Sequence, residues 1–265
     1  MTYLYETHMH TSQASACGRS VGRDYIQKYM DAGYSGIIIT DHFYRGNCRI
    51  DRDLPWPEFV NQFCAGYEDA RNEGEKRGFP VFFGWEENFD GDEYLIYGLD
   101  KAWMKAHPEM PTWTRRQQYD IVRAAGGCVV QAHPFRARGY NHAIYLSHAL
   151  CDAVEGFNAA NEPRWNSLAL RYAEVIGLPV TAGSDNHCAD TMRPEKLAGV
   201  TFERPLNSIG DYVSAILEKR SFGLSLPAPA EPWTDAVTPD LPCHWLDAEG
   251  REDEVGVLDI LRRGL

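Results

Sequence analysis

The sequence lacks the features that mark membrane-spanning and secreted proteins. Its apolar stretches, such as "GIIIT" and "PVFFGW", are far shorter than the roughly 20 residues that cross a bilayer. Its N-terminus lacks a charged leader followed by a long apolar segment. We therefore expect a protein that is neither membrane-spanning nor secreted.

Paired cysteines are also missing. The chain has seven cysteines, an odd number, and none of them forms a C-x-x-C pair. Scattered thiols of this kind fit a reducing compartment better than a disulfide framework. The predicted location is the cytoplasm.

Basic charge is in short supply. The 26 lysines and arginines face 38 aspartates and glutamates, which gives a formal net charge of -12. This balance disfavours binding to the phosphate backbone of nucleic acid, which needs an extended basic surface. A small anionic substrate remains compatible with it, because local metal ions and arginines are sufficient to bind one. The composition does not indicate an oligomeric state.

What the chain does have is the alternating pattern of an α/β protein. Its 265 residues are enough for one barrel of about 250 residues. The predicted strands are 3–8, 36–41, 80–86, 94–98, 127–132, 152–157 and 179–184. The predicted helices are 22–32, 56–77, 113–125, 142–150, 163–176 and 207–219, several of them ended by glycine. This order favours a parallel sheet that closes, or nearly closes, into a barrel covered by helices, although an open sheet is an alternative.

Two segments depart from regular alternation. The gap between strands 80–86 and 94–98 is too short for a helix, so a hairpin or direct turn is expected there. After residue 222 the chain becomes rich in proline, which predicts a barrel domain over 1–222 and an extension over 223–265 that acts as a tail or a lid. A short terminal helix is expected to pack on the barrel through Val255, Val257, Leu258 and Leu261.

Metal-ligand residue types stand at the ends of the predicted strands. His8 and His10, in "ETHMHTS", are two positions apart, so in a strand they project to the same side, roughly 6 to 7 Å apart. The full set is Asp41, His42, Glu86, His133, Glu155, Asn158, Asp185 and His187 together with His8 and His10. Each residue alone has an ordinary structural explanation, such as a core histidine or a helix cap. Because the carboxyl ends of parallel strands meet at one face, the set jointly predicts a cluster of two or three metal ions, of zinc, iron or manganese.

Five short motifs carry a family resemblance. They are "HMHT" at 8–11, "TDH" at 40–42, "GWE" at 84–86, "AHP" at 132–134 and "GSDNH" at 183–187. In this order and spacing the chain resembles the PHP family, named for polymerase and histidinol phosphatase, over residues 1 to about 200. The resemblance implies a distorted (β/α)₇ TIM-like barrel with a trinuclear site at the carboxyl end of the strands and phosphoester hydrolysis as the usual activity.

The resemblance also implies a ligand set. His8, His10, Glu86 and Asp185 would hold a first ion. Glu86 would bridge to a second ion that His133 also binds, and His42 and His187 would hold a third. Asp41, which is beside a ligand, is expected to support the catalytic site by orienting that ligand.

Two family positions do not match. Where relatives place a histidine or aspartate for the third ion, this chain has Ser15 and Ala16, and Cys17 follows as a possible thiolate ligand or simply as a small loop residue. Where many relatives place a histidine for the second ion, it has Leu95. Glu93, Asp92 or water remain alternatives there.

The predicted reaction is hydrolysis of a small-molecule phosphomonoester. A metal cluster polarises the phosphoryl oxygens and supplies hydroxide near neutral pH, and the hypothesis is in-line attack by a hydroxide that bridges the ions. A proton for the leaving oxygen would come from metal-bound water or from His187. The candidates for binding the substrate are Arg136, Arg164, Arg19, Arg138 and Asn158. Aromatic residues in "FDGDEYLIYG", "NEPRWN" and "AEPWTD" are candidates for a pocket wall, although core packing is the commoner role.

Three other functions remain open. The same barrel and ions would polarise a carbonyl, so hydrolysis of an amide is one alternative. The unmatched ligand positions leave room for a regulatory or inactive metal-binding PHP module. A nuclease is the third, and the acidic balance and the absence of an added nucleic-acid module rank it last.

Overall fold

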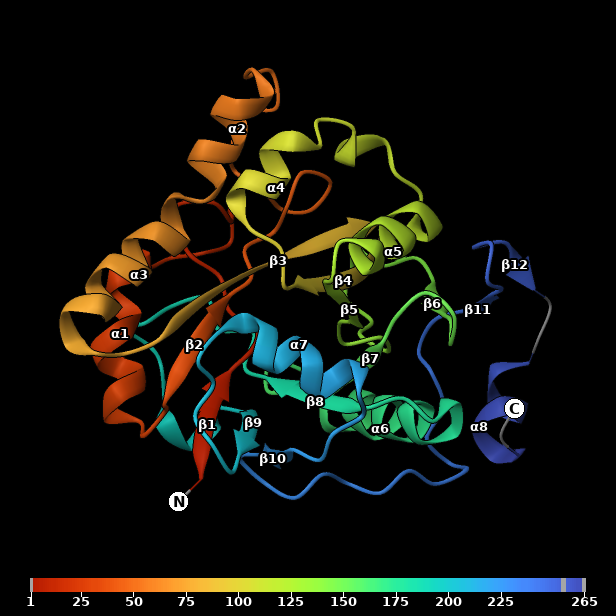
Figure 1. Ribbon diagram of the computed structural model, residues 1–265. Helices are drawn as coiled ribbons and strands as arrows, with labels where there is room; N and C mark the ends of the chain where they lie inside the picture. The colour runs from red at the N-terminus through yellow and green to blue at the C-terminus, as the bar shows by residue number, and fades with distance from the viewer. Residues whose placement is uncertain (1, 254–255, 264–265) are drawn as a thin grey trace.

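The computed structural model describes residues 2–253 and 256–263, and at its centre a curved sheet forms a nearly closed barrel (Figure 1). The sheet has nine strands in the order β10 (Gly223–Ser225), β9 (Gly199–Phe202), β1 (Tyr3–Glu6), β2 (Gly36–Ile39), β3 (Val81–Phe89), β4 (Asp92–Tyr97), β5 (Cys128–Gln131), β7 (Ala153–Asn158) and β8 (Val180–Gly183). The predicted TIM-like α/β barrel is thus confirmed. The sheet contains more strands than a sevenfold repeat.

The barrel closes between β1 and β8, just past their carboxyl ends. The N–H of Asp185 donates to the carbonyl of His8 over 2.8 Å, and Met9 pairs with Asn186 in a parallel bridge. This closure brings the first and last predicted motifs side by side, although about 175 residues separate them in the chain.

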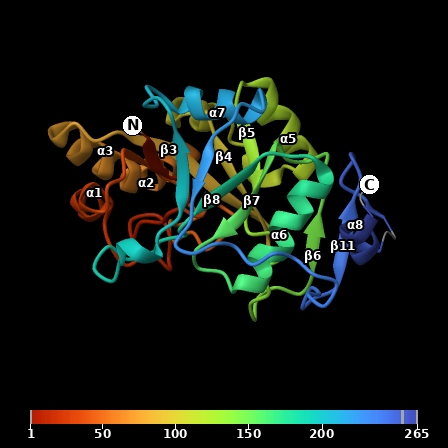
Figure 2. The ribbon, with the colours of Figure 1, turned by 90° about the horizontal axis from the view of Figure 1, so that it is seen from below.

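Helices surround the barrel (Figures 1 and 2). They are α1 (Gly22–Asp31), α2 (Trp56–Phe63), α3 (Ala65–Arg77), α4 (Lys101–Ala106), α5 (Arg115–Ala124), α6 (Pro163–Ile176), α7 (Ile209–Leu217) and α8 (Val257–Arg263). The predicted helix ends at glycine are confirmed, since Gly78 and Gly177 directly follow α3 and α6 with a φ of 66°. Only glycine adopts this left-handed backbone without a steric cost.

The local sequence also explains where α5 and α6 begin. The first residue of α6 is Pro163, whose fixed φ suits the first helical position. The N-terminus of α5 has a reciprocal cap, in which Thr114 and Gln117 bond to each other's backbone N–H. The predicted segment 113–125 therefore becomes helical from Arg115.

Two helix predictions need correction. The segment 56–77 is divided at Cys64 into α2 and α3. The segment 142–150 contains no helix; Ile144–Leu146 forms β6, in a separate small sheet with β11 (Cys243–Leu246) and β12 (Glu252–Asp253). β6 pairs in parallel with β11, a partner almost 100 residues later, and so distant a partner leaves no periodic signal in the local sequence.

The predicted hairpin is confirmed. β3 and β4 pair antiparallel around a tight turn at Asp90 and Gly91, both of which have a positive φ. β4 is also antiparallel to β5. β9 and β10, at the other edge, are antiparallel additions that the sequence pattern did not indicate.

The segment after residue 222 packs along the outside of the barrel. β10 pairs with β9, and α8 contacts α6 through the buried residues Val257 and Leu261 and the partly buried Leu258. Val255, also expected in this contact, lies outside the described residues. The domain boundary at 222 stays a prediction. Among residues 2–253 and 256–263, no helix combines the length and the apolar character that crossing a membrane requires.

Candidate metal centre

Four predicted ligands meet at the barrel mouth, where β1 and β8 end beside β3. His10 Nε2 lies 3.2 Å from His8 Nε2 and 3.1 Å from Asp185 Oδ1. Glu86 Oε1 lies 3.3 Å from His8 Nε2, and Glu86 Oε2 lies 3.6 Å from His10 Nε2. Ligands about 2.0–2.1 Å from one tetrahedral zinc ion are roughly 3.3 Å apart, so this donor set fits a shared cation.

A second group extends from Glu86. Its Oε1 lies 3.1 Å from His133 Nε2, and Glu93 Oε2 lies 3.6 Å from the same ring nitrogen. The donor atoms of His8, Glu86 and His133 all lie within 4.8 Å of one another. Glu86 therefore lies between two groups, as a bridging carboxylate would.

A third group consists of imidazoles. His10, His42 and His187 offer donor atoms within 4.8 Å of one another, and the ring of His10 stacks between the other two at centroid distances of 4.3 and 4.4 Å. His42 Nδ1 also lies 2.7 Å from Glu86 Oε2. Despite this short distance the two buried atoms are not aligned as a hydrogen bond, and neither has a hydrogen-bond partner among the described residues. Buried polar atoms without a partner are costly, and a cation between them would satisfy both.

Burial and opposite charge act against each other in this cluster. Burial raises the pKa of Glu86, but His42 and His8 outweigh it and hold the pKa of this carboxyl well below its ordinary value. Burial lowers the pKa of His8, but Glu155, Asp185 and Glu86 together raise it well above the ordinary value. A bound cation would compete with protons for the ring nitrogens of these imidazoles. It would then offset the negative charge of the carboxylates in place of those protons.

Other side chains orient the candidate ligands. Glu155 Oε1 lies 2.8 Å from His8 Nδ1, and its other oxygen accepts from the N–H of His133 over 3.1 Å. This arrangement turns Nε2 of His8 toward the cluster, as carboxylate–histidine pairs do in metal sites.

Asp41 acts one step further out. Its carboxylate accepts from the N–H and the hydroxyl of Thr11 and from the hydroxyl of Ser15, at 2.6 to 2.7 Å. Ser15 in turn contacts His10 Nδ1 at 3.3 Å and accepts from the N–H of His42. Asp41 therefore touches the cluster only through these partners, in keeping with an orienting role and not with direct participation in the reaction.

Two candidate ligands have an unusual backbone. His133 and Asp185 have φ values of 28° and 53°, in the left-handed region that residues with a side chain rarely adopt. Such conformations persist where the surroundings fix them, and they concentrate at functional sites.

Cys17 lies beside the third group. Burial raises the pKa of its thiol, but hydrogen bonds with His187 and His42 outweigh burial and lower the pKa to about 6. The thiolate form, which is the form that binds metal ions, is thereby favoured.

Asp92, Glu93 and Leu95 were considered where many relatives have a histidine for the second ion, and on β4 these three residues have different surroundings. Glu93 is buried and faces the cluster. Asp92 instead pairs with Arg115 and accepts from Tyr94, and Leu95 lies in the barrel core. Glu93, one of the alternatives for this position, lies in β4 and not in the expected turn, because the strand begins at Asp92, two residues before the predicted start.

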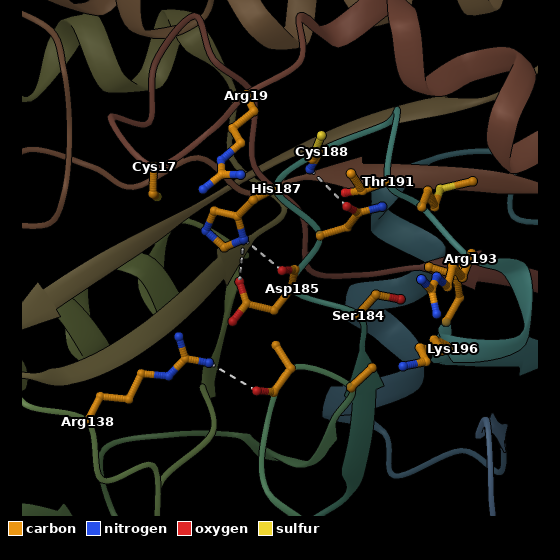
Figure 3. A pocket seen from close by; sticks show the side chains of 15 residues that line it. Cys17, Arg19, Arg138, Ser184, Asp185, His187, Cys188, Thr191, Arg193 and Lys196 are labelled. Atoms are coloured by element: carbon orange, nitrogen blue, oxygen red, sulfur yellow. Dashed lines mark hydrogen bonds and ion pairs between the residues drawn. The ribbon is translucent and has the colours of Figure 1, made fainter.

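Two cavities open beside the cluster and share Cys17, Arg138, Ala160, Asp185 and His187. The inner cavity, of about 500 Å³, is lined by His42, Glu93, Arg45, Arg136 and Tyr140. The cationic cavity, of about 570 Å³, lies on the other side of Asp185 and is lined by Arg19, Arg193 and Lys196 (Figure 3). No lining residue comes from the proline-rich extension, so a lid over these cavities is not observed in the described residues.

Four of the predicted substrate-binding residues lie in or next to the cavities. Arg136 is buried; it pairs with Asp185 over 2.7 Å and donates to Asn158 and Asn161, which leaves Nη1 without a partner among the described residues. Arg19 and Arg138 line the cationic cavity. Asn158 is fully buried, and its Oδ1 accepts from Arg136 and from the N–H of Ala160, two residues that line the cavities.

Arg164 does not lie at the site. Its guanidinium is half exposed at the start of α6 and pairs with Glu162 and with Asp240 of the extension. The prediction failed because "NEPRWN" follows the strand that ends at Asn158, yet Pro163 starts a helix that carries the side chain outward.

The aromatic residues considered for a pocket wall lie elsewhere. Tyr94 and Tyr97 are buried in the core, and Trp165 and Trp233 pack in the cluster around α6. The aromatic side chain that lines the inner cavity is Tyr140, which is 56% exposed. Tyr140, Arg45, Arg193 and Lys196 were all missed, since they lie outside any motif.

Comparisons with known proteins agree with the class that the sequence motifs predict. A family model described as PHP-associated matches residues 163–221, which include Asp185 and His187. A relative from Deinococcus radiodurans, described as a probable histidinol-phosphatase, is 28% identical over 234 residues, which cover 71% of this chain and 87% of the relative.

Two solved structures share the fold. One, from Bifidobacterium adolescentis and described as a metal-dependent phosphoesterase, has a TM-score of 0.53 at 17% identity and covers 80% of this chain and 96% of its own. The other, from Bacteroides vulgatus, is a two-domain protein described as containing a PHP-like metal-dependent phosphoesterase; its TM-score is 0.58 at 14% identity, over 85% of this chain and 65% of its own. Together these matches confirm the resemblance to the PHP family, and the names of the relatives agree with the predicted class, a metal-dependent hydrolase.

Proposed function

We propose that this protein is a metal-dependent phosphoesterase that hydrolyses a small phosphomonoester. The observation that carries the proposal is the donor cluster at the barrel mouth, in which ring nitrogens and carboxylate oxygens from distant strands lie 2.7 to 3.6 Å apart beside an arginine-lined cavity. The name of the Deinococcus radiodurans relative makes a phosphomonoester the first substrate class to test.

The proposed ligands follow the groups of the cluster. His8, His10, Glu86 and Asp185 would hold one ion, and Glu86 and His133 a second, with Glu93 in place of the missing histidine. His42 and His187 would hold a third, completed by Cys17. The ions would be two or three of zinc, manganese or iron; when bound, such ions lower the pKa of water and offset negative charge on a phosphoryl group.

The chain's own residues would bind and orient the ester. Nη1 of Arg136 has no partner within residues 2–253 and 256–263 and would donate to a phosphoryl oxygen, while Nη2 remains fixed to Asp185. Arg45 also lines the inner cavity, and its buried Nη2 has no hydrogen-bond partner among the described residues. His187, about a third exposed, donates from Nδ1 to the carbonyl of Asp185, so Nε2 is its one free ring nitrogen. This nitrogen would bind the third ion where three ions are held, and would pass a proton to the leaving oxygen where only two are held.

The location proposed for this reaction is the cytoplasm. All seven cysteines are free thiols, and four of them are buried. Free thiols persist in reducing compartments.

The test is hydrolysis by the manganese-reconstituted protein of p-nitrophenyl phosphate, of a bis ester and of single-stranded DNA. We expect turnover of the monoester to exceed that of the other two. Arg136→Ala should lose monoester turnover while retaining its metal content, and Arg116→Ala, an exposed arginine on α5, should behave as wild type. Inactivity on all three substrates with metals bound would contradict the proposal and favour an amide hydrolase or a regulatory module.

A further inference from the structure

We propose that the cationic cavity binds a second anionic group of the substrate, so that the protein selects small phosphomonoesters that carry a carboxylate or another phosphate. The inference rests on the proposed phosphoesterase function and narrows its substrate class. It is carried by four cations that line a single cavity in a protein of net charge -12.

The charges of this cavity are not balanced by the protein. Arg19, Arg138, Arg193 and Lys196 form no ion pair with any carboxylate of residues 2–253 and 256–263, whereas most arginines of the chain do. The single carboxylate in the lining is Asp185, and Arg136 already pairs with it. An anion in this cavity would therefore meet cations that have no competing partner.

The fold sets these side chains in place relative to the metal centre. The N–H of Arg19 donates to the carbonyl of His187 over 2.8 Å, and the guanidinium of Arg138 donates to the carbonyl of Ala160 over 3.0 Å. Figure 3 shows Arg19 beside His187 and Arg138 on the far side of Asp185.

Arg193 and Lys196 come from the loop between β8 and β9, at the short 3-10 helix Pro194–Lys196. This loop is fixed next to Asp185, because the Ser184 hydroxyl accepts from the N–H of Ala198 over 2.9 Å and donates to its carbonyl over 3.1 Å. In Figure 3 both side chains lie together beyond Ser184. A substrate with its phosphate at the cluster would thus extend its far end toward this pair.

The cavity also suits a small and polar ligand in size. Its volume of about 570 Å³ lies within the range of roughly 300–1,000 Å³ that is usual for small-molecule sites. Its exposed cations remain hydrated, so each contact with an anion is modest and the selectivity depends on several acting together.

The test uses alkyl phosphates of two to five carbons whose far end is a methyl, a carboxylate, a phosphate or an ammonium group. We expect kcat/KM of the manganese-loaded protein to be roughly tenfold higher for the anionic ends than for methyl, and lowest for ammonium. The preference should shrink as ionic strength rises. A larger gain for phosphate than for carboxylate would identify the second group as a phosphate, and the reverse order as a carboxylate.

The variant Arg193→Gln/Lys196→Gln should reduce the ratio of kcat/KM between the anionic and methyl ends to about twofold or less. The matched control, Lys28→Gln/Arg204→Gln, removes two exposed cations outside both cavities and should keep the wild-type ratio. Equal kcat/KM for anionic and methyl ends, or a ratio that the cavity variant leaves unchanged, would overturn the inference while the proposed function stands.

If neither p-nitrophenyl phosphate nor any alkyl phosphate is hydrolysed, the proposed function fails, and binding tests the cavity by itself. Calorimetry with the corresponding alkyl phosphonates and metal-loaded protein should then show tighter binding of the phosphonates with an anionic far end than of those with a methyl end. This difference in affinity should be smaller in Arg193→Gln/Lys196→Gln. Equal affinities for the methyl and anionic phosphonates would contradict the inference directly.

Discussion

The donor cluster and the cationic cavity share a border at Asp185 and His187, yet they are built in opposite ways. The donors of the cluster are mostly buried, and other side chains hold them, as Glu155 holds His8. The four cations of the cavity are exposed and lack carboxylate partners among the described residues. The comparison teaches that the proposed chemistry rests on fixed groups, whereas the proposed selectivity rests on several weak and hydrated contacts. Loss of a donor should therefore have far larger effects than loss of a cation.

The largest effect is expected at Glu86, which lies between all three groups of the cluster. Glu86→Gln should lower phosphomonoester turnover by more than the about 10–100-fold that loss of an outer partner typically costs. It should also lower metal content, because the neutral amide is a poor bridging ligand. Metal analysis and rate measurements on the same sample check this, with the exposed Glu203→Gln as the control. Full metal content together with wild-type rates would remove Glu86 from the centre.

Removing the metal ions should destabilise the barrel mouth. A ligand present at 100 times its Kd stabilises the folded state by about 2.7 kcal/mol, so chelation should lower Tm measurably. The Tm shift on adding manganese back should be smaller in Asp185→Asn than in wild type, because Asp185 Oδ1 lies 3.1 Å from His10 Nε2. Equal Tm values with and without chelator would show that the cluster does not bind ions under those conditions.

An intermediate effect is expected at Glu155, which contacts His8 and not the predicted ions. Glu155→Gln should weaken metal binding by about 10–100-fold while the fold is retained. Titration of the metal-free protein with manganese measures this. Glu174→Gln, on the exposed face of α6, is the matched control. If Glu155→Gln binds manganese as wild type does, the orientation of His8 does not depend on this carboxylate.

The smallest effect concerns Cys17. In the metal-free protein the pKa of the Cys17 thiol is about 6, so the thiolate predominates above that pH. An ultraviolet titration should therefore show a rise in thiolate absorbance near pH 6, and Cys17→Ser should remove it. Because this folded-state pKa is below the ordinary 9.0, its contribution to stability is complete above about pH 9 and is lost as the pH falls through about 6. A first thiolate step only near pH 9, the same in both proteins, would exclude this role.

The sequence predicted the donor cluster well because strand ends carry it. His8, His10, Glu86 and Asp185 each follow or lie in an apolar β pattern, and in an α/β barrel such positions converge at one face. The closure between β1 and β8, which the pattern favoured, is what brings the first and last of them together. Their roles as metal ligands remain predictions until ions are observed.

Other features depend on long-range contacts that a local pattern does not contain. β6 was predicted as helix because its partner, β11, lies almost 100 residues later. Glu93 was placed in a turn because its strand extends further toward the hairpin than its apolar residues do. Arg193 and Lys196 lie at a three-residue 3-10 helix, too short to show periodicity, where charge alone does not separate a cavity wall from ordinary surface.

Anomalous diffraction at the zinc, manganese and iron edges, from crystals of the protein as purified and after soaking with divalent ions, tests the central claim most directly. The account predicts two or three anomalous peaks about 2.0–2.3 Å from the donor atoms of His8, Glu86 and His133 and their neighbours. No peak in this cluster after soaking, or ions bound only at other sites, would contradict it.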